Sequence, residues 1–262
     1  MCNFITLTTD FGYKDNFVGV VKGVIYNINP DAKIVDLCHE VSPQDIMGAA
    51  FALKTAYNYF PKGTIHLVVI DPGVGTDRLP ILVKTKDYYF IGPDNGVLSL
   101  ALEEQKVEGI IYLDNFEHYL MPVSNTFHAR DIFAPVAAQL TQGISYPLFG
   151  RAIKEYKKIN LVKIKISARV ISGEVIYIDR FGNLITNIGQ DLEKNIQGSI
   201  IKIKNKAVKG LKTSYADAVP KELLAIFGSS GFLEIAVNLG SAKDKLKAKI
   251  GDKVSIFSNG KN

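Results

Sequence analysis

The sequence predicts two domains of different class: an α/β domain with a central, mostly parallel sheet over residues 1–165, and a smaller, antiparallel β-barrel-like domain over residues 166–262. Apolar runs of strand length alternate with helical periods in the first half, which is typical of α/β domains. Beyond about residue 173, short apolar runs follow one another between Gly, Asn and Asp, and long helical periods disappear. The Lys-rich segment 150–172 separates these two patterns, so we expect the domain boundary within it.

The first elements in order are a strand, a helix, a second strand and a second helix. Residues 3–8 form a β-prone run, and Asp15 can cap a helix in which apolar residues recur at helical spacing from Phe17 to Ile28. Residues 33–37 predict the next strand. Ser42-Pro43 predicts the start of the second helix, because proline is favoured at the first helical position.

A buried parallel strand is predicted at Ile65–Ile70, a short, β-branched apolar run that ends at Asp71-Pro72-Gly73. Residues 81–85 and 88–91 then predict a hairpin, and Gly92-Pro93-Asp94-Asn95-Gly96 predicts a turn before a short helix. The second half predicts a series of short strands, at residues 174–179, 184–188, 199–203, 222–227, 233–237 and 253–257.

The composition excludes several classes of protein. With 47% hydrophobic and 22% charged residues, the chain is typical of globular proteins. We expect no membrane partner, because no apolar run approaches the ~18 residues that span a bilayer. The two cysteines, Cys2 and Cys38, do not make a disulfide framework, and no secretory signal pattern is present, so we expect a cytoplasmic protein.

The charge changes sign along the chain. Residues 1–150 carry 10 basic and 16 acidic side chains, net −6, whereas residues 151–262 carry 21 and 10, net +11. Such a split is typical of a nucleic-acid surface or of two complementary faces in an oligomer, and solvated lysines explain it equally well. The lysines of residues 151–169 alternate with Ile and Val rather than with base-stacking aromatic residues, so we expect no nucleic-acid partner.

Candidate ligand-binding residues follow the predicted strands of the first half. Open α/β sheets bind ligands beyond the carboxyl ends of their strands, and this rule selects Asp10 and Asp71, although aspartate also suits ordinary turns. The glycine-rich loop from Asp71 to Arg78 matches neither phosphate-binding fingerprint, but it places a carboxylate and a guanidinium on one loop. His128 opens a helical run, where a structural role is the usual one, and the four histidines lack metal-ligand spacing, so no metal is expected.

Two polar turns of the second half are further candidates. Asp179-Arg180-Phe181-Gly182-Asn183 follows one predicted strand, and Gly228-Ser229-Ser230-Gly231 precedes another. A turn is the simplest explanation of each. As ligand loops, they offer a carboxylate, an amide and hydroxyl groups, which suit an amino acid or the edge of a nucleobase.

Six motifs taken in order resemble the S-adenosyl-L-methionine (SAM) hydroxide adenosyltransferases, or SAM hydrolases, a family that also contains the adenosyl fluorinase and chlorinase. The resemblance covers nearly the whole chain and implies that water or hydroxide displaces methionine at the ribose 5′ carbon of SAM, giving adenosine and L-methionine. It implies no cofactor, since SAM is the substrate. The motifs are Thr9-Asp10-Phe11-Gly12, Val69-Ile70-Asp71-Pro72-Gly73-Val74-Gly75, Gly92-Pro93-Asp94-Asn95-Gly96, Phe127-His128-Ala129-Arg130-Asp131, Asp179-Arg180-Phe181-Gly182-Asn183 and Gly228-Ser229-Ser230-Gly231.

The resemblance also implies a role for each candidate residue. Asp10 would bind the ribose hydroxyls. The nucleophilic water would be held by a catalytic set, namely Asp71, Arg78 and His128. The methionine amino and carboxylate groups would bind Asp179 and Ser229, and the adenine would bind Asn183. The resemblance further implies a homotrimer whose active sites lie at subunit interfaces, between the first domain of one subunit and the second domain of its neighbour.

Two alternatives remain beside hydrolysis. An adenosyl halogenase would use chloride, but His128 and Ala129 stand where halogenases have Tyr and Ser, and Asp71 replaces another tyrosine. A carboxylate at that place would repel a halide. A non-catalytic SAM or adenosine sensor would need Asp10 and Ser229 but not the catalytic set.

Overall fold

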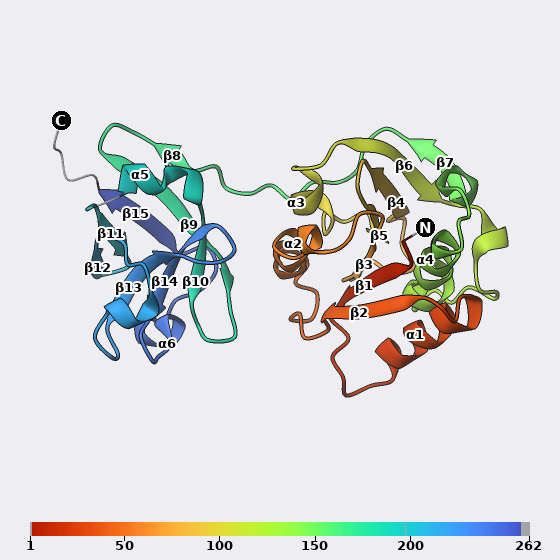
Figure 1. The fold of residues 1–262 in the computed structure, drawn as a ribbon, viewed down its shortest axis with the longest axis horizontal. Helices are drawn as coiled ribbons and strands as arrows, with labels where there is room; N and C mark the ends of the chain where they lie inside the picture. The colour runs from red at the N-terminus through yellow and green to blue at the C-terminus, as the bar shows by residue number, and fades with distance from the viewer. Residues whose placement is uncertain (1, 197, 258–262) are drawn as a thin grey trace. The chain divides into compact units, whose positions relative to one another are not determined.

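The buried apolar side chains gather in separate cores, and the chain divides accordingly into two units, Met1–Ile159 and Asn160–Asn262 (Figure 1). The computed structural model describes residues 2–196 and 198–257. None of the helices in this described part of the chain is long and apolar enough to cross a membrane.

The first unit is built on a seven-stranded sheet with the order β2-β1-β3-β5-β4-β6-β7. Parallel pairing joins β2, β1, β3 and β5, whereas β4 is antiparallel to β5 and β6, and β7 is antiparallel to β6. Five of the seven strands therefore point the same way, and the predicted α/β class is confirmed. The strands are β1 (Phe4–Thr9), β2 (Lys33–Cys38), β3 (Ile65–Val69), β4 (Pro80–Thr85), β5 (Tyr89–Pro93), β6 (Val107–Leu113) and β7 (Gly150–Ile153).

Helices cover both faces of this sheet (Figure 1). Because side chains alternate along a strand, Leu67 of β3 faces the layer of α1 and α4, whereas Val68 faces the layer of α2 and α3. This double covering explains why β3 is apolar throughout. The helical elements are α1 (Phe17–Ile28), α2 (Ile46–Lys54), η1 (Tyr57–Tyr59), α3 (Ser99–Leu102), η2 (Phe116–His118), the π-helical turn η3 (Ala129–Phe133), α4 (Ala134–Thr141) and η4 (Tyr146–Phe149).

Two expected helix starts are wrong. The N-cap of α1 is Asn16 rather than Asp15, and α2 begins at Ile46 rather than at Ser42-Pro43. Gln44 lies between that proline and the helix with a φ of 67°, which no α-helix accepts. Asp45 caps α2 instead, and its Oδ1 accepts a hydrogen bond from the backbone N–H of Gly48 at 2.8 Å.

The second unit is an antiparallel sheet of eight strands with the order β12-β11-β15-β9-β10-β14-β13, with β8 paired to β9. The two end strands, β12 and β13, lie next to one another, so the sheet is a nearly closed barrel, as predicted. The strands are β8 (Lys165–Ile166), β9 (Val170–Ile178), β10 (Leu184–Gly189), β11 (Ile200–Ile203), β12 (Lys206–Lys209), β13 (Leu223–Phe227), β14 (Phe232–Val237) and β15 (Lys253–Phe257). Short helical segments join them, namely η5 (Gln190–Leu192), α5 (Glu193–Ile196), η6 (Tyr215–Asp217) and α6 (Ala242–Leu246).

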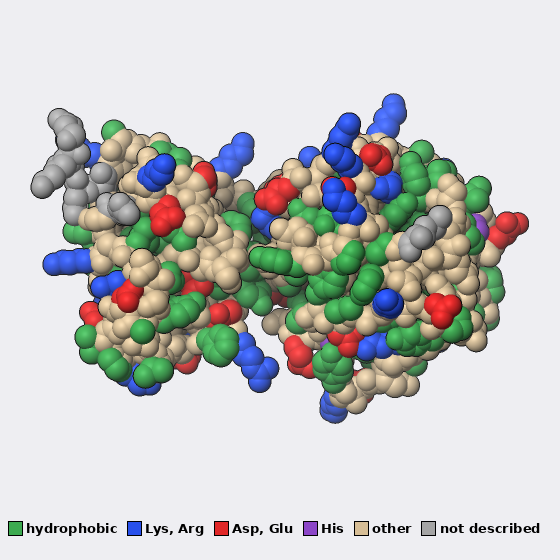
Figure 2. All heavy atoms as spheres, in the orientation of Figure 1, with side chains coloured by type: hydrophobic (Ala, Val, Ile, Leu, Met, Phe, Trp, Pro, Cys, Tyr) green, Lys and Arg blue, Asp and Glu red, His purple; other side chains and the backbone are tan. Residues whose placement is uncertain are grey.

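The surplus of basic residues in the second unit does not make a continuous basic surface on the face shown in Figure 2. There, the visible Lys and Arg side chains of the described residues lie among acidic and apolar ones. A buried apolar core fills the barrel. Its members include Val175, Leu184, Ile201, Ile235 and Val254.

Candidate active site

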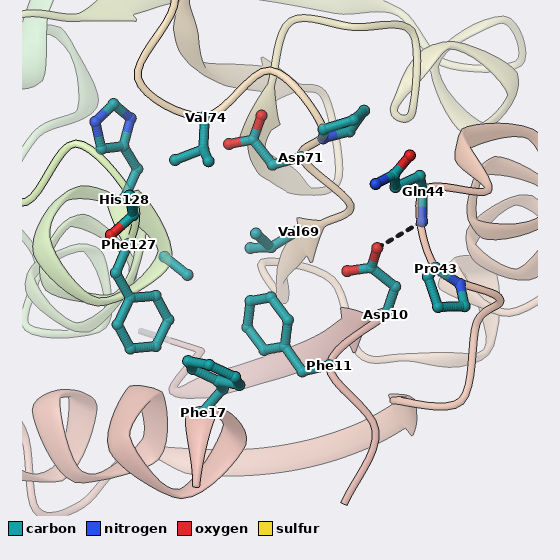
Figure 3. A pocket seen from close by; sticks show the side chains of 13 residues that line it. Asp10, Phe11, Phe17, Pro43, Gln44, Val69, Asp71, Val74, Phe127 and His128 are labelled. Atoms are coloured by element: carbon teal, nitrogen blue, oxygen red, sulfur yellow. Dashed lines mark hydrogen bonds between the residues drawn. The ribbon is translucent and has the colours of Figure 1, made fainter. Parts of the chain in front are cut away.

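A pocket of about 280 Å³ opens at the carboxyl ends of β1 and β3, where the sheet of the first unit was expected to bind a ligand (Figure 3). Four chain segments meet there: the loop after β1 with the start of α1, the segment before α2, the loop after β3, and the segment that opens η3. The lining residues are Asp10, Phe11, Phe17, Pro43, Gln44, Val69, Asp71, Pro72, Val74, Thr126, Phe127, His128 and Ala129.

Arg78 joins Asp71 and His128 into one hydrogen-bonded group. Its Nε donates to Asp71 Oδ1 at 2.8 Å, and its Nη2 contacts Asp71 Oδ2 and lies 2.7 Å from His128 Nδ1. The side chains of Asp71 and Arg78 are only 7% and 5% exposed, so their bidentate ion pair is shielded from solvent. Among the described residues, Nη1 of Arg78 is buried without a hydrogen-bond partner.

Burial and the charge of Arg78 together keep His128 neutral. A guanidinium only donates hydrogen bonds, so Nδ1 of His128 accepts and the ring hydrogen lies on Nε2. Burial lowers the pKa of His128, the charge of Arg78 lowers it further, and Asp71 and Asp131 oppose the shift. His128 is therefore a neutral imidazole that can donate from Nε2.

Asp10 lies in the same pocket, directly after β1. Its Oδ2 accepts a hydrogen bond from the backbone N–H of Gln44 at 2.8 Å, drawn as a dashed line in Figure 3. The strained φ of 67° at Gln44 accompanies this contact, as strain often does at functional sites. The other carboxylate oxygen of Asp10 points into the pocket, where it can accept hydrogen bonds from a ligand.

Three phenylalanine rings form an apolar wall beside these polar groups. Phe11 lies 5.6 Å from Phe17 and 6.1 Å from Phe127 between ring centroids, and Phe17 lies 5.3 Å from Phe127. Such a wall can cover the flat face of a base or attract a cationic group. The pocket thus combines an apolar surface with two carboxylates and a histidine, and Arg78 lies behind this lining, hydrogen-bonded to Asp71 and His128.

Asp131 holds the segment that leads to His128. It is fully buried, and its Oδ2 accepts a hydrogen bond from the backbone N–H of Ser124 at 2.8 Å. Arg130 Nε donates to its Oδ1 at 2.6 Å. No specific role for Asp131 or Gln44 was predicted. Asp131 belongs to the same sequence motif as His128, whereas no sequence pattern indicated Gln44.

In the second unit, the structure brings Asp179 and Asn183 together. The carboxylate of Asp179 accepts hydrogen bonds from the backbone N–H of Asn183 at 2.8 Å, from that of Phe181 at 2.9 Å and from Nδ2 of Asn183 at 2.8 Å. Ser229 is exposed in the turn between β13 and β14. The predicted residues thus fall into two groups, one in each unit.

A buried carboxylate lies beneath the turn that carries Ser229. Glu234 accepts a hydrogen bond from the hydroxyl of Tyr215 at 2.7 Å, and a side chain at Gly228 would collide with it. Burial raises the pKa of Glu234, the hydrogen bond from Tyr215 opposes this, and the charge of Asp179 adds to the increase. Within the described residues, no group of three or more His, Cys, Asp and Glu side chains is arranged to hold a metal ion.

Comparisons with known proteins agree along the whole chain. The profile described as SAM hydroxide adenosyltransferase N-terminal domain matches residues 5–150, and the C-terminal domain profile matches residues 173–255. A protein of Methanocaldococcus jannaschii named (R)-S-adenosyl-L-methionine hydrolase is 39% identical, over 97% of this chain and 96% of its own. A protein of the same name from Salinispora tropica is 35% identical, over 97% of both chains.

Fluorinases are less similar. The one from Nocardia brasiliensis is 26% identical over 96% of both chains. Among solved structures, a conserved protein of Thermotoga maritima, described as uncharacterized, superimposes with a TM-score of 0.91. It is 41% identical and covers 97% of this chain and 99% of its own.

Proposed function

The chain belongs to the SAM hydroxide adenosyltransferase family, and we propose that it hydrolyses SAM to adenosine and L-methionine. The observation that carries this proposal is the shielded group of Asp71, Arg78 and His128 at the end of β3. The relatives named as hydrolases are named for the R epimer at sulfur, and this supports (R)-SAM as the proposed substrate.

In the proposed reaction, the oxygen of a water molecule attacks the ribose 5′ carbon, and the bond between that carbon and sulfur breaks. Methionine departs as a neutral thioether, so no general acid is required. The free Nη1 of Arg78 and the Nε2 hydrogen of His128 donate to the attacking oxygen and favour its hydroxide form. The proton passes to Asp71, whose carboxylate oxygens keep lone pairs beside their bonds to Arg78.

The remaining groups would bind the substrate. Asp10 would accept hydrogen bonds from the ribose hydroxyls, and the wall of Phe11, Phe17 and Phe127 would cover the apolar part of the nucleoside. In the second unit, Asp179 and Ser229 would hold the amino and carboxylate groups of methionine, and Asn183 would bind the adenine. No cofactor takes part in these steps.

We further propose a homotrimer, with the pocket of one subunit completed by Asp179, Asn183 and Ser229 of its neighbour. The opposite net charges of residues 1–150 and 151–262, −6 and +11, support head-to-tail contacts, and such contacts close into a ring of three when successive subunits are related by a threefold rotation. The expected compartment is the cytoplasm.

The function is tested by separating the products after incubation with a mixture of SAM epimers in a chloride buffer. Adenosine and methionine are expected, with (R)-SAM consumed first. Chlorinated adenosine as the main product would make the protein a halogenase, and binding without turnover would make it a sensor. Protein with His128→Ala, purified in the same way, controls for contaminating hydrolases and is expected to be inactive.

A further inference from the structure

The turn Gly92-Pro93-Asp94-Asn95-Gly96 takes no part in the chemistry above, yet it contacts both ends of the loop that carries Asp71 and Arg78. Nδ2 of Asn95 donates to the carbonyl of Ile70 at 2.8 Å, directly before Asp71. The backbone N–H of Asp94 donates to the carbonyl of Leu79 at 2.8 Å, directly after Arg78. The entry and the exit of the loop are therefore tied to the same turn.

The turn itself is held from several sides. Oδ1 of Asn95 accepts a hydrogen bond from the backbone N–H of Val97 at 3.1 Å. The buried carboxylate of Asp94 accepts one from the backbone N–H of Lys157 at 2.7 Å. Gly92 allows β5 to pack closely against β3, because a Cβ at this position would lie only 2.5 Å from the carbonyl oxygen of Val68. The donor of Asn95 thus has a fixed position.

The contact between Asn95 and Ile70 has a clear physical effect. Strand β3 ends at Val69, so the carbonyl of Ile70 lies beyond the strand, and Ile70 is fully buried. A buried carbonyl requires a donor, and the Asn95 amide supplies one. This hydrogen bond fixes the peptide plane between Ile70 and Asp71, and with it the direction in which the Asp71 side chain leaves the backbone.

On this geometry, and resting on the proposed function, we propose that Asn95 is a positioning residue that holds Asp71, and through it Arg78 and His128, in the reactive arrangement. Small displacements of groups that orient a nucleophile lower turnover strongly, whereas substrate affinity depends mainly on other contacts. Loss of the Asn95 donor should therefore lower kcat more than it raises KM.

The test is Asn95→Asp, which preserves the shape and the acceptor for Val97 but replaces the donor to Ile70 with an oxygen. We expect kcat for SAM to fall at least tenfold and KM to change less than threefold. Because Arg78 would move away from His128, the NMR titration of His128 should shift to higher pH; its signal is assigned by its absence from His128→Gln. Asn95→Ser removes the same amide donor without adding charge. If Asn95→Asp does not fold, the same changes in kcat, KM and the titration of His128 are expected in Asn95→Ser and test the proposal.

A matched control exists in the same unit. Asn115 makes the same pair of contacts, from Nδ2 to the carbonyl of Leu148 at 2.9 Å and from the backbone N–H of Glu117 to Oδ1 at 3.2 Å, but the carbonyl that it holds lies outside the loop of Asp71 and Arg78. Asn115→Asp is expected to keep wild-type kcat. Wild-type kcat in Asn95→Asp, or an equal loss in Asn115→Asp, would overturn the proposal. If the wild type does not hydrolyse SAM, the proposed function fails, and the titration of His128 in Asn95→Ser, which adds no charge of its own, decides the role of Asn95.

Discussion

At the scale of single residues, Arg78 is the centre of the site, because it binds a carboxylate on one side and an imidazole on the other. A protonated His128 would direct an N–H toward a group that only donates, and it would add a like charge. The reactive form is therefore the one in which His128 is neutral. Burial and Arg78 both lower the pKa of His128, so this form persists below the usual pKa of histidine, about 6.5.

This argument predicts the pH dependence of turnover. Since the pKa of His128 is lowered, the ring takes up its proton only below pH ~6.5, and kcat should stay constant from pH 8 through 6.5 before it falls. Measurement of kcat across this range, with NMR titration of His128 in parallel, checks it. A fall in kcat centred at or above pH 6.5 would contradict the assigned role of the neutral ring.

Asp10 should act on binding rather than on chemistry. Asp10→Asn can still accept the hydrogen bond from Gln44, but it loses the charge that strengthens hydrogen bonds to ribose, worth roughly 1.5 to 3 kcal/mol. We expect the Kd for SAM to rise about 10- to 100-fold, measured by calorimetry in a His128→Ala background that prevents turnover. Asp15→Asn, an exposed neighbour outside the pocket, should leave the Kd unchanged. An unchanged Kd in Asp10→Asn would remove Asp10 from the substrate site.

At the scale of elements, two loops form the site by packing against each other. Gly75 has a φ of 76° and its Cα faces the carbonyl of Asn125, so the loop after β3 touches the segment before His128 at a place where no side chain fits. Gly75→Ala adds both a strained φ and a collision with that carbonyl. We expect kcat to fall at least tenfold, as measured by steady-state hydrolysis of SAM.

Gly210→Ala is the matched control for this variant. Gly210 also has a positive φ, 64°, but nothing lies within 4 Å of the place where its Cβ would be. Gly210→Ala should therefore lower Tm, because alanine is strained at a positive φ, and it should leave kcat unchanged. If Gly75→Ala kept wild-type kcat, the contact between the two loops would not be needed for turnover.

The elements that were predicted correctly are those whose signal is local. The strand β3 follows from the short, β-branched apolar run Ile65–Ile70, and the β4–β5 hairpin follows from two apolar runs around a turn. The start of α2 was wrong because a contact distant in sequence, between Gln44 and Asp10, sets the backbone before the helix. The strand β12 was missed because only Val208 of its four residues is buried.

The same distinction applies to the candidate site. Asp10 and Asp71 could be found because strand ends mark ligand sites in α/β sheets. The contact between Arg78 and His128 joins residues 50 positions apart, and no local pattern indicates it. Each of the other three histidines also has a polar partner: His39 contacts Thr9, His66 contacts Thr6 and His118 contacts Gln139. His128 was distinguished from these by its place at the start of a helical run and by the order of the motifs.

At the scale of the whole molecule, the predicted site residues are divided between the two units, so the proposed trimer can be tested by subunit exchange. We expect His128→Ala to inactivate the first unit and Asp179→Asn to inactivate the second. When the two proteins are mixed, dissociated and reassembled at random, roughly a quarter of the shared sites should combine two wild-type halves. Activity should reappear on mixing, while each variant alone stays inactive. No recovery despite subunit exchange confirmed by mass spectrometry would exclude a shared site.

The central claim is that water attacks the ribose 5′ carbon of SAM in the pocket of Asp71, Arg78 and His128. The most direct measurement is the mass spectrum of the products formed in water enriched in oxygen-18. The account predicts adenosine that carries the heavy oxygen at the 5′ position, together with unlabelled methionine, and no labelled adenosine from Arg78→Ala. Heavy oxygen in a product derived from the amino-acid chain, release of free adenine, or adenosine without the label would each contradict it.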